Sequence, residues 1–386
     1  MKKVILCAGA LMFGAVSFAQ SNDSNVNQDG NGNDATVTQT GSENDSDVDQ
    51  SGSVSPGAVD NDAIVVQTGS ENMSIIRQRR NRNLATTTQL GADNKSTVTQ
   101  LSSDNFSDVD QIGDENKATV TQGGGDFNRS DIDQVGDDNV ALNYQWGVRN
   151  QATSLQVGND NDSNINQKGI RNMSDVSQDG TENIADVDQI GNVNSSEVIQ
   201  GSTSFESRNG LVVQYQEGNA NSAYARQEED KNTVYQTQVG NSNTASVTQN
   251  ILTFGDSNTT TQNQNGFGNT ATASQENSLS DTAGVDGDNN MILQNQTGRL
   301  NTATATQNGT ANTSELNQVG RDNVDMQTQI GNGNTSYVSQ RGVGHEATLY
   351  QQGNMNASTV LQRGNTHMSV VSQVGNMNSA SVLQRD

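Results

Sequence analysis

Side-chain amides recur along this sequence at a spacing of 11 residues. Gln fills one position of the repeat in all 31 units that align, from Gln28 to Gln384, and Asn stands six residues earlier in 28 of them. A primary amide carries two N–H donors and one carbonyl acceptor, so each stacked copy can bond the copies above and below it. The chemistry expected of these residues is a hydrogen-bonded ladder.

The other chemistry-bearing residues also fall on the repeat. Both histidines, His345 and His367, occupy the Asn position 22 residues apart. The pair is a candidate for a metal or pH-sensitive site, because neutral imidazoles bind metals and change charge between pH 5 and 8. Two polar substitutions in an Asn ladder is the simpler interpretation. No separate polar constellation of the kind that catalysis needs remains, so the sequence predicts no enzyme and no cofactor.

A short strand followed by a turn must position the amides. With Asn as position zero, the unit reads Asn-x-Ala/Ser-x-Val-x-Gln-x-Gly-x-x. Positions zero, two, four and six alternate with variable polar residues, which is the pattern of a strand with one buried face. Gly at position eight suits a tight turn, because glycine adopts positive φ without steric cost. The units begin at residues 22, 33, 44, 61, 72, 83, 94, 105, 116, 128, 139, 150, 161, 172, 183, 194, 210, 221, 232, 243, 258, 269, 290, 301, 312, 323, 334, 345, 356, 367 and 378.

Side-chain volumes indicate which units face each other. Four units with Gln at position four have a bulky position two, and the intervening units have smaller residues. The bulky pairs are Val212/Gln214, Val234/Gln236, Thr260/Gln262 and Ile292/Gln294, and the small pairs are Ala223/Ala225, Ala245/Val247, Ala271/Ala273 and Ala303/Ala305. Such compensation keeps a shared layer close-packed. Units n and n+1 are therefore expected in opposite sheets, with units n and n+2 stacked about 4.8 Å apart.

The fold class that follows is all-β. We expect a two-sheet parallel β-solenoid with cross-β, amyloid-like stacking, two 11-residue strand-turn units per rung and about 15.5 rungs. Its length at the strand spacing would be roughly 75 Å. Insertions at 53–60, near 123–127, at 203–209, at 250–257 and at 276–289 all follow the Gln and precede the next Asn, so they should bulge from turns. The 276–289 stretch leaves room for one degenerate unit, which would make the count 32.

Composition narrows the function classes. Hydrophobic residues form 30% of the chain and its net charge is -24, a combination typical of disorder. The strict period favours an ordered solenoid instead, because neighbouring repeats share a thin core. A chain this acidic, with 20 Lys plus Arg, is poorly suited to nucleic acid, whose binding depends on neutralising phosphates.

The first residues resemble a secretion signal. Lys2 and Lys3 precede an apolar run at 4–16, and Ser17-Phe18-Ala19 fits a cleavage site. We therefore divide the chain into a signal peptide at 1–19 and a single repeat domain at 20–386. Cleavage would remove Cys7, the only cysteine, leaving no disulfide and no apolar stretch long enough to span a membrane.

Repeats close to both ends of the sequence favour polymerisation. Solenoids that remain monomeric cover their strand edges with polar capping units, and consensus units here stand in both terminal positions. An odd number of units would also leave a half rung for a second molecule to complete. The residues expected to form these ladders and edges are Asn22, Ser24, Val26, Gln28, Asn33 and Gln39 at one end and His367, Gln373, Asn378, Ala380, Val382 and Gln384 at the other.

The run Gln178-x-Gly180-x-x-Asn183-x-Ala185-x-x-x-Gln189 resembles the curlin repeat of curli, the bacterial functional amyloid. The resemblance extends over nearly all of residues 22–386, with about three times the usual number of repeats. It implies a secreted subunit of a cell-surface fibre that serves biofilm matrix and adhesion. Such a fibre is a homopolymer of the subunit and contacts cells or matrix. It also implies two partners, a curli nucleator and an outer-membrane secretion channel. Family members carry a non-repeat segment for channel recognition, whereas here only Gln20 and Ser21 separate the predicted signal from the first repeat.

Three alternatives remain beside the major fibre subunit. One is the minor, surface-attached nucleator, and another is a monomeric extracellular adhesin. The third is an ice-binding solenoid, suggested by outward Thr pairs at Thr36/Thr38, Thr97/Thr99, Thr119/Thr121 and Thr304/Thr306. Outward Asp pairs either bind Ca²⁺ or serve as solvating charges that limit aggregation, the second being the simpler interpretation. These pairs are Asp47/Asp49, Asp108/Asp110, Asp131/Asp133 and Asp186/Asp188.

Overall fold

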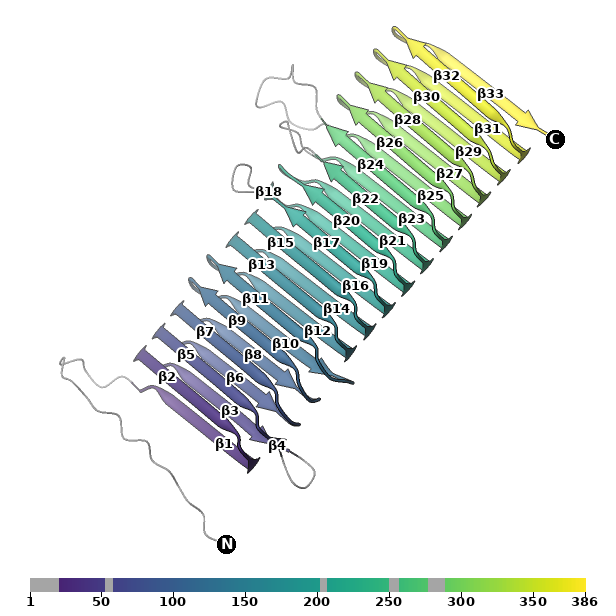
Figure 1. Cartoon of the computed structure of the whole chain (residues 1–386). Helices are drawn as coiled ribbons and strands as arrows, with labels where there is room; N and C mark the ends of the chain where they lie inside the picture. Colours follow the sequence, from purple (N-terminus) through teal and green to yellow (C-terminus); the bar gives the residue numbers. More distant parts are fainter. Residues whose placement is uncertain (1–20, 53–57, 202–206, 250–256, 277–288) are drawn as a thin grey trace.

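The computed structural model describes residues 21–52, 58–201, 207–249, 257–276 and 289–386. Every regular element in these ranges is a β-strand, and the strands stack into a long two-layered body (Figure 1). The strands β1 and β33 lie at opposite ends of the stack (Figure 1). The described residues contain no helix long and apolar enough to cross a membrane. The chain is thus the all-β solenoid expected from the repeat, with about 15 turns.

The first sheet contains every second unit of the chain. Its strands pair in parallel and have the bounds β1 (Asp23–Asn31), β3 (Asp45–Ser51), β4 (Ala58–Val59), β6 (Met73–Gln78), β8 (Lys95–Gln100), β10 (Lys117–Gly123), β12 (Val140–Val148), β14 (Asp162–Ile170), β16 (Ile184–Asn192), β19 (Leu211–Asn219), β21 (Thr233–Asn241), β23 (Thr259–Phe267), β25 (Met291–Arg299), β27 (Thr313–Arg321), β29 (Thr335–Val343), β31 (Ala357–Asn365) and β33 (Ser379–Arg385). β4 is a short piece that pairs with the end of β1, so the described residues contribute 16 unit strands to this sheet.

The second sheet contains the units between them. Its parallel strands are β2 (Asp34–Ser42), β5 (Asp62–Ser70), β7 (Leu84–Ala92), β9 (Phe106–Ile112), β11 (Arg129–Val135), β13 (Gln151–Asn159), β15 (Met173–Thr181), β17 (Ser195–Gln200), β18 (Ser207–Arg208), β20 (Ser222–Gln227), β22 (Thr244–Gln249), β24 (Thr270–Glu276), β26 (Thr302–Asn308), β28 (Val324–Ile330), β30 (Glu346–Gln352) and β32 (Met368–Val374). β18 is a short piece paired with β15, which leaves 15 unit strands of this sheet in the part of the chain that the structure describes.

Each unit pairs with the second unit along the chain, position for position. Gln28 is opposite Gln50 in the β1–β3 pair, and Gln156 is opposite Gln178 in the β13–β15 pair. The register continues past the long insertion at 276–289, because β25 pairs directly with β23 and β26 with β24. Residues 277–288, where the sequence leaves room for a 32nd unit, lie outside the described residues.

The thin core between the sheets is made by positions two and four. Side chains at position two of one strand contact position four of the strand from the neighbouring unit: Thr87 lies 3.2 Å from Ser96, and Ser154 donates a 2.7 Å hydrogen bond to Ser163. Apart from the end rungs, these positions are almost completely buried, as at Val176 and Ala185. The interlock of consecutive units inferred from side-chain volumes is therefore present.

The turns depend on glycine at position eight for a second reason besides φ. Gly158 has φ 108°, and a Cβ on it would lie 2.0 Å from the backbone oxygen of Gly180 in the next rung. Position ten is also left-handed, including residues that rarely adopt this conformation, such as Val193 at φ 59°. The spacing of the sequence did not reveal this second left-handed position.

Candidate functional site: the amide ladders and the end surfaces

The invariant Gln forms a continuous ladder inside each sheet. The Gln67 Nε2 atom donates to Gln89 Oε1 at 2.8 Å, and Gln89 donates to Gln111 at 2.8 Å. The same Gln67 Nε2 also donates across the core to the backbone oxygens of Asp45 and Asn72, at 2.9 and 3.0 Å. Each Gln therefore links its own sheet along the stack and ties it to the facing sheet. The shorter Asn side chain has less reach for this double role.

Asn at position zero forms a second ladder that also closes the turns. Asn94 donates from its backbone N–H and from Nδ2 to Asn72 Oδ1, at 3.1 and 3.0 Å. Its Nδ2 donates as well to the backbone oxygen of Gly113, at 2.6 Å. Both ladders are almost entirely buried, and unpaired amides there would each cost about 1–3 kcal/mol.

A third ladder was missed by the sequence reasoning, although its signal was present. Gln214 donates to Gln236 at 2.7 Å, Gln236 to Gln262 at 3.0 Å and Gln262 to Gln294 at 2.8 Å. These four residues stand at position four, where the volume argument used them only to mark the units whose position two is bulky. Their succession in every second unit was the signal that they stack.

The ladders have a direction along the solenoid. In the Gln ladder each residue donates to the copy later in the chain, as Gln28 does to Gln50 and Gln362 to Gln384. In the Asn ladder the direction is reversed, because Asn378 donates to Asn356. The two ends of the stack are thus chemically different.

The surface formed by β1 and β2, here the N-terminal end surface, leaves Gln acceptors open. Gln28 Oε1 and Gln39 Oε1 receive no hydrogen bond from any described residue, while their Nε2 atoms donate inward to Gln50 and Gln67. Asn22 Oδ1 accepts from Asn44 at 3.1 Å, and the Asn33 Nδ2 atom donates to the Ala58 oxygen at 3.0 Å. All nine residues of β1 are exposed, including Ser24, and Val26 retains 45% exposure.

The surface formed by β32 and β33, here the C-terminal end surface, is its complement. Gln373 and Gln384 accept from the preceding rung and donate to the Ala357 and Met368 oxygens, at 2.9 and 2.8 Å. One N–H of each amide therefore has no acceptor among the described residues. Asn378 Oδ1 receives no hydrogen bond from them either. Ala380 and Val382 pack only partly against the last hydrophobic cluster.

The two histidines lie one above the other near this end. Their rings are stacked with centroids 5.2 Å apart, and the His367 N–H donates to His345 Nδ1 at 3.3 Å. The Nε2 atoms lie near different backbone oxygens, those of Arg341 and Arg363, and His367 also faces Asp386 at 3.2 Å. Burial lowers the pKa of His345 below its ordinary value of 6.5, with a smaller contribution from the neighbouring His367. Across the described ranges no three His, Cys, Asp or Glu side chains group as metal ligands.

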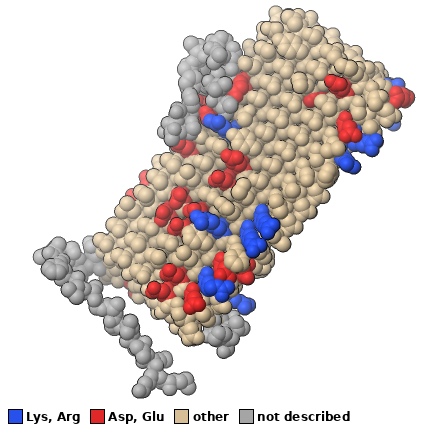
Figure 2. Space-filling view, viewed as in Figure 1, with Lys and Arg blue, Asp and Glu red and all other residues tan. Residues whose placement is uncertain are grey.

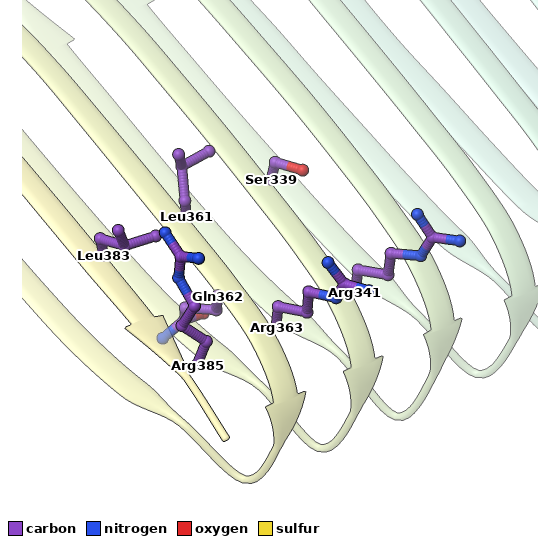
Figure 3. Close-up of a pocket in the computed structure, with 7 residues that line it drawn as sticks. All are labelled: Ser339, Arg341, Leu361, Gln362, Arg363, Leu383 and Arg385. Carbon is purple, nitrogen blue, oxygen red and sulfur yellow. The ribbon is translucent and has the colours of Figure 1, made fainter.

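A column of arginines accompanies the same rungs on the outer face. Arg341, Arg363 and Arg385 pair in register on β29, β31 and β33. They border an open pocket of about 300 Å³ together with Leu361 and Leu383 (Figure 3). Acidic and basic side chains are otherwise scattered along the face seen in Figure 2, and other residues form most of it.

The structure brings two of the four outward Asp pairs together. Asp108 and Asp110 on β9 pair with Asp131 and Asp133 on β11. Burial, followed by repulsion from the other carboxylates, raises the pKa of Asp108 to about 6, and burial also raises the pKa of Asp133. The Arg129 side chain lies 3.5 Å from Asp131. Asp47/Asp49 and Asp186/Asp188 lie on β3 and β16, away from this cluster.

Outward Thr pairs form a small array. Thr97 and Thr99 on β8 pair with Thr119 and Thr121 on β10, but the flanking strands β6 and β12 present Ile, Arg, Leu and Tyr at these positions. Two rungs of threonine are far shorter than the uniform surface that the ice-binding alternative needs. On β12 the Trp146 ring covers Gly123 and Gly124, where a Cβ would come within 2.8 and 2.5 Å of it.

Comparison with known protein families finds a match to the 11-residue repeat. The family described as curlin associated repeat matches the chain over residues 19–52 and 81–113, two segments of about three units each. Comparison with curated proteins finds no match. The matched segments contain the same Asn, Gln and Gly positions that form the ladders and turns throughout the solenoid.

Proposed function

We propose that this chain, which belongs to the curlin family and is a structural protein, assembles head to tail into extracellular curli-type amyloid fibres. The observation that carries the proposal is the complementarity of the two end surfaces. The N-terminal end surface offers open Gln acceptors, and the C-terminal end surface offers open Gln donors. Joining unlike ends satisfies both, whereas joining like ends places acceptor against acceptor or donor against donor.

Burial of the end residues adds a driving force. Val26, 45% exposed in the single chain, would enter the core on assembly, and burying the part that is still exposed contributes roughly 1 kcal/mol. The backbone edges of the terminal strands would pair as all internal strands already do. Each added copy thereby creates a new pair of open edges, which is the property of a growing cross-β fibre.

The remaining parts of the proposal rest on family membership and on the sequence. Residues 1–19 act as a secretion signal, and the assembled fibres serve biofilm matrix and adhesion at the cell surface. A curli nucleator and an outer-membrane channel are the proposed partners. The solenoid supplies the mechanical part of this role, because backbone pairing and the Gln ladder hold the rungs together and the Asn ladder adds to them in most rungs.

The test compares growth of residues 20–386 with growth of two variants that alter one end only. Val26→Lys places a charge on the inward face of β1, whereas Asn25→Lys places the same charge on its outward face. We expect the unaltered chain and Asn25→Lys to form fibres with a cross-β spacing near 4.8 Å by electron microscopy and fibre diffraction. Val26→Lys should remain folded by circular dichroism. At substoichiometric amounts it should stop growth of the unaltered chain at one of the two fibre ends, because its intact C-terminal end surface joins that end and its altered N-terminal end surface then blocks it.

Two outcomes would overturn the proposal. One is a folded, unaltered chain that stays monomeric at all concentrations. The other is a Val26→Lys variant that elongates as fast as Asn25→Lys.

A further inference from the structure

The relative rotation of neighbouring copies follows from the arrangement of the end strands, given the head-to-tail assembly proposed above. β1 and β33 lie in the same sheet, because the described stack contains 16 unit strands in the first sheet and 15 in the second. The outermost strands at the C-terminal end surface are β33 in the first sheet and β32 in the second. β33 therefore stands half a rung beyond β32.

The next vacant strand position consequently belongs to the second sheet. Inside the solenoid, position four of a unit lies between position two of the preceding unit and position two of the following unit. Ser314 and Ser336 both donate to Gln327 Oε1, which shows this arrangement directly. At the end of the stack, Ala380 on β33 has such a position-four partner on one side only, from β32.

Two registers would join the copies head to tail. In the direct register, β1 of the next copy pairs with β33, and each sheet continues as itself. This leaves a strand-wide gap in the second sheet between β32 and β2 of the next copy, with their backbone edges unpaired. In the other register β1 fills that gap, and the sheets continue without interruption.

We propose that successive copies are related by a half turn about the fibre axis, so that β1 pairs with β32, β2 pairs with β33 and the two sheets exchange at every joint. Edge strands buried without partners are costly, because each unpaired backbone group in a dry site loses about 1–3 kcal/mol. The half turn leaves none of them unpaired. Units of one repeat occupy both sheets of this chain, so a strand from either sheet fits the other.

The side chains at the joint fit this register. Gln373 and Gln384 meet Gln28 and Gln39 of the next copy, which continues both Gln ladders in their observed direction. Val26 of the next copy comes between Ala380 and its own Ala35, the same small–Val–small layer that fills the internal rungs. Asn33 of the next copy reaches the open Asn378 Oδ1.

The fibre then has a repeat of two copies. One copy advances about 74 Å at the strand spacing, and the same face returns after about 150 Å. Surface features such as the arginine column at Arg341, Arg363 and Arg385 appear on alternate sides of the fibre. A partner that binds this column would be spaced along each side at the longer interval.

Disulfide cross-linking distinguishes the two registers. Residues 20–386 contain no cysteine, so Asn27→Cys/Ser372→Cys reports the half-turn joint and Asn27→Cys/Leu383→Cys reports the direct joint. All three positions are exposed and outward. Neighbouring parallel strands place Cα atoms about 4.8 Å apart, within disulfide range, whereas the non-matching pair lies on opposite outer faces more than about 10 Å apart. We expect the first variant to give at least about tenfold more intermolecular disulfide than the second.

A surface label then tests the half turn itself. Gold on Gln151→Cys, an exposed position of β13, should alternate between the two sides of the fibre at about 74 Å intervals. The matched control deletes residues 356–366, one whole unit, which makes the count even and should bring all labels to one side. Preferential cross-linking of the Leu383 variant, or labels on one side in both chains, would overturn the half turn while leaving the fibre intact. Absence of fibres, or fibres with neither cross-link, would instead overturn the proposed head-to-tail assembly.

Discussion

Asp325 is a buried acid at a position where nearly all other units have Ala or Ser. It lies on β28 with 1% exposure, between Ala303 and Ala347 of the adjacent rungs. Its Oδ2 accepts from Gln327 Nε2 at 2.7 Å, and its Oδ1 has no partner among the described residues. Burial raises the pKa of Asp325 well above its ordinary value of 3.8, against smaller opposing contributions from hydrogen bonds.

We predict that Asp325→Ser stabilises these rungs at neutral pH. Removing a buried, unpaired polar atom is worth about 1–3 kcal/mol, and the serine hydroxyl can still accept from Gln327. A further, pH-dependent gain has a defined sign. The unfolded chain ionises above pH 3.8 while the folded carboxyl stays protonated, so the native stability falls by up to about 1.4 kcal/mol per pH unit until the raised pKa is reached. The advantage of Asp325→Ser should therefore grow from pH 4 upward.

Amide hydrogen exchange of monomeric chain measures this locally, since a repeat protein opens by segments. A gain of about 1.4 kcal/mol appears as a tenfold larger protection factor for β26, β28 and β30. Glu346→Ser is the matched control, because it removes a carboxylate from the exposed face of the next strand, β30. Protection that is equal in Asp325→Ser and the parent chain at pH 7, or a gain that does not change with pH, would refute the reasoning.

Three further predictions concern the ladder, the turn and the acidic cluster. Gln156→Ala should destabilise its rungs by about 3–5 kcal/mol in urea titrations, because it leaves the neighbouring ladder amides unpaired. The control Thr153→Ala changes an outward side chain and should cost less than about 1 kcal/mol. Equal effects of the two substitutions would contradict a ladder role for Gln156. Gly158→Ala should lower the melting temperature far more than Gly333→Ala does. The added Cβ meets a backbone oxygen at 2.0 Å in the first case and nothing nearer than 3.8 Å in the second. Similar melting temperatures of the two variants would argue against a close approach of neighbouring rungs at Gly158. Burial and neighbouring carboxylates raise the pKa of Asp108 to about 6, so the folded protein loses stability as the pH rises from 3.8 to 6. Asp108→Asn cannot ionise, so this variant should lose less stability over the same pH range. An unchanged pH profile of unfolding would count against the acidic cluster.

Much of the fold was predictable because the determining signals are local and repeated. Alternation at positions zero to six defined strands with one buried face, and the compensation between Val212 and Ala225 identified consecutive units as facing partners. The 22-residue pairing and the two-sheet solenoid agree with those predictions. Backbone conformations that the fold imposes could not be predicted from the repeat pattern. The left-handed conformation at Val193 carries no residue signature, because the fold imposes it on whichever residue stands at position ten.

The candidate site likewise has features that the repeat predicts and features that depend on the folded structure. The amide ladders follow from stacking identical residues, but the bond from Gln67 to the facing sheet depends on how closely the two sheets approach. The clustering of Asp108 with Asp131 depends on which outward residues happen to share a face. Their 23-residue separation becomes a direct neighbour relation only after the solenoid has formed.

The sequence by itself determined the period, the strand-turn unit, the inward and outward faces and the order in which units stack, because each is set by side-chain alternation within 11 residues. Only the tertiary structure decided the direction of the ladders, the double use of each Gln and the difference between the two end surfaces. These depend on the orientation of amide groups across rungs and between sheets. A repeating sequence is compatible with either orientation, and the packed solenoid has one.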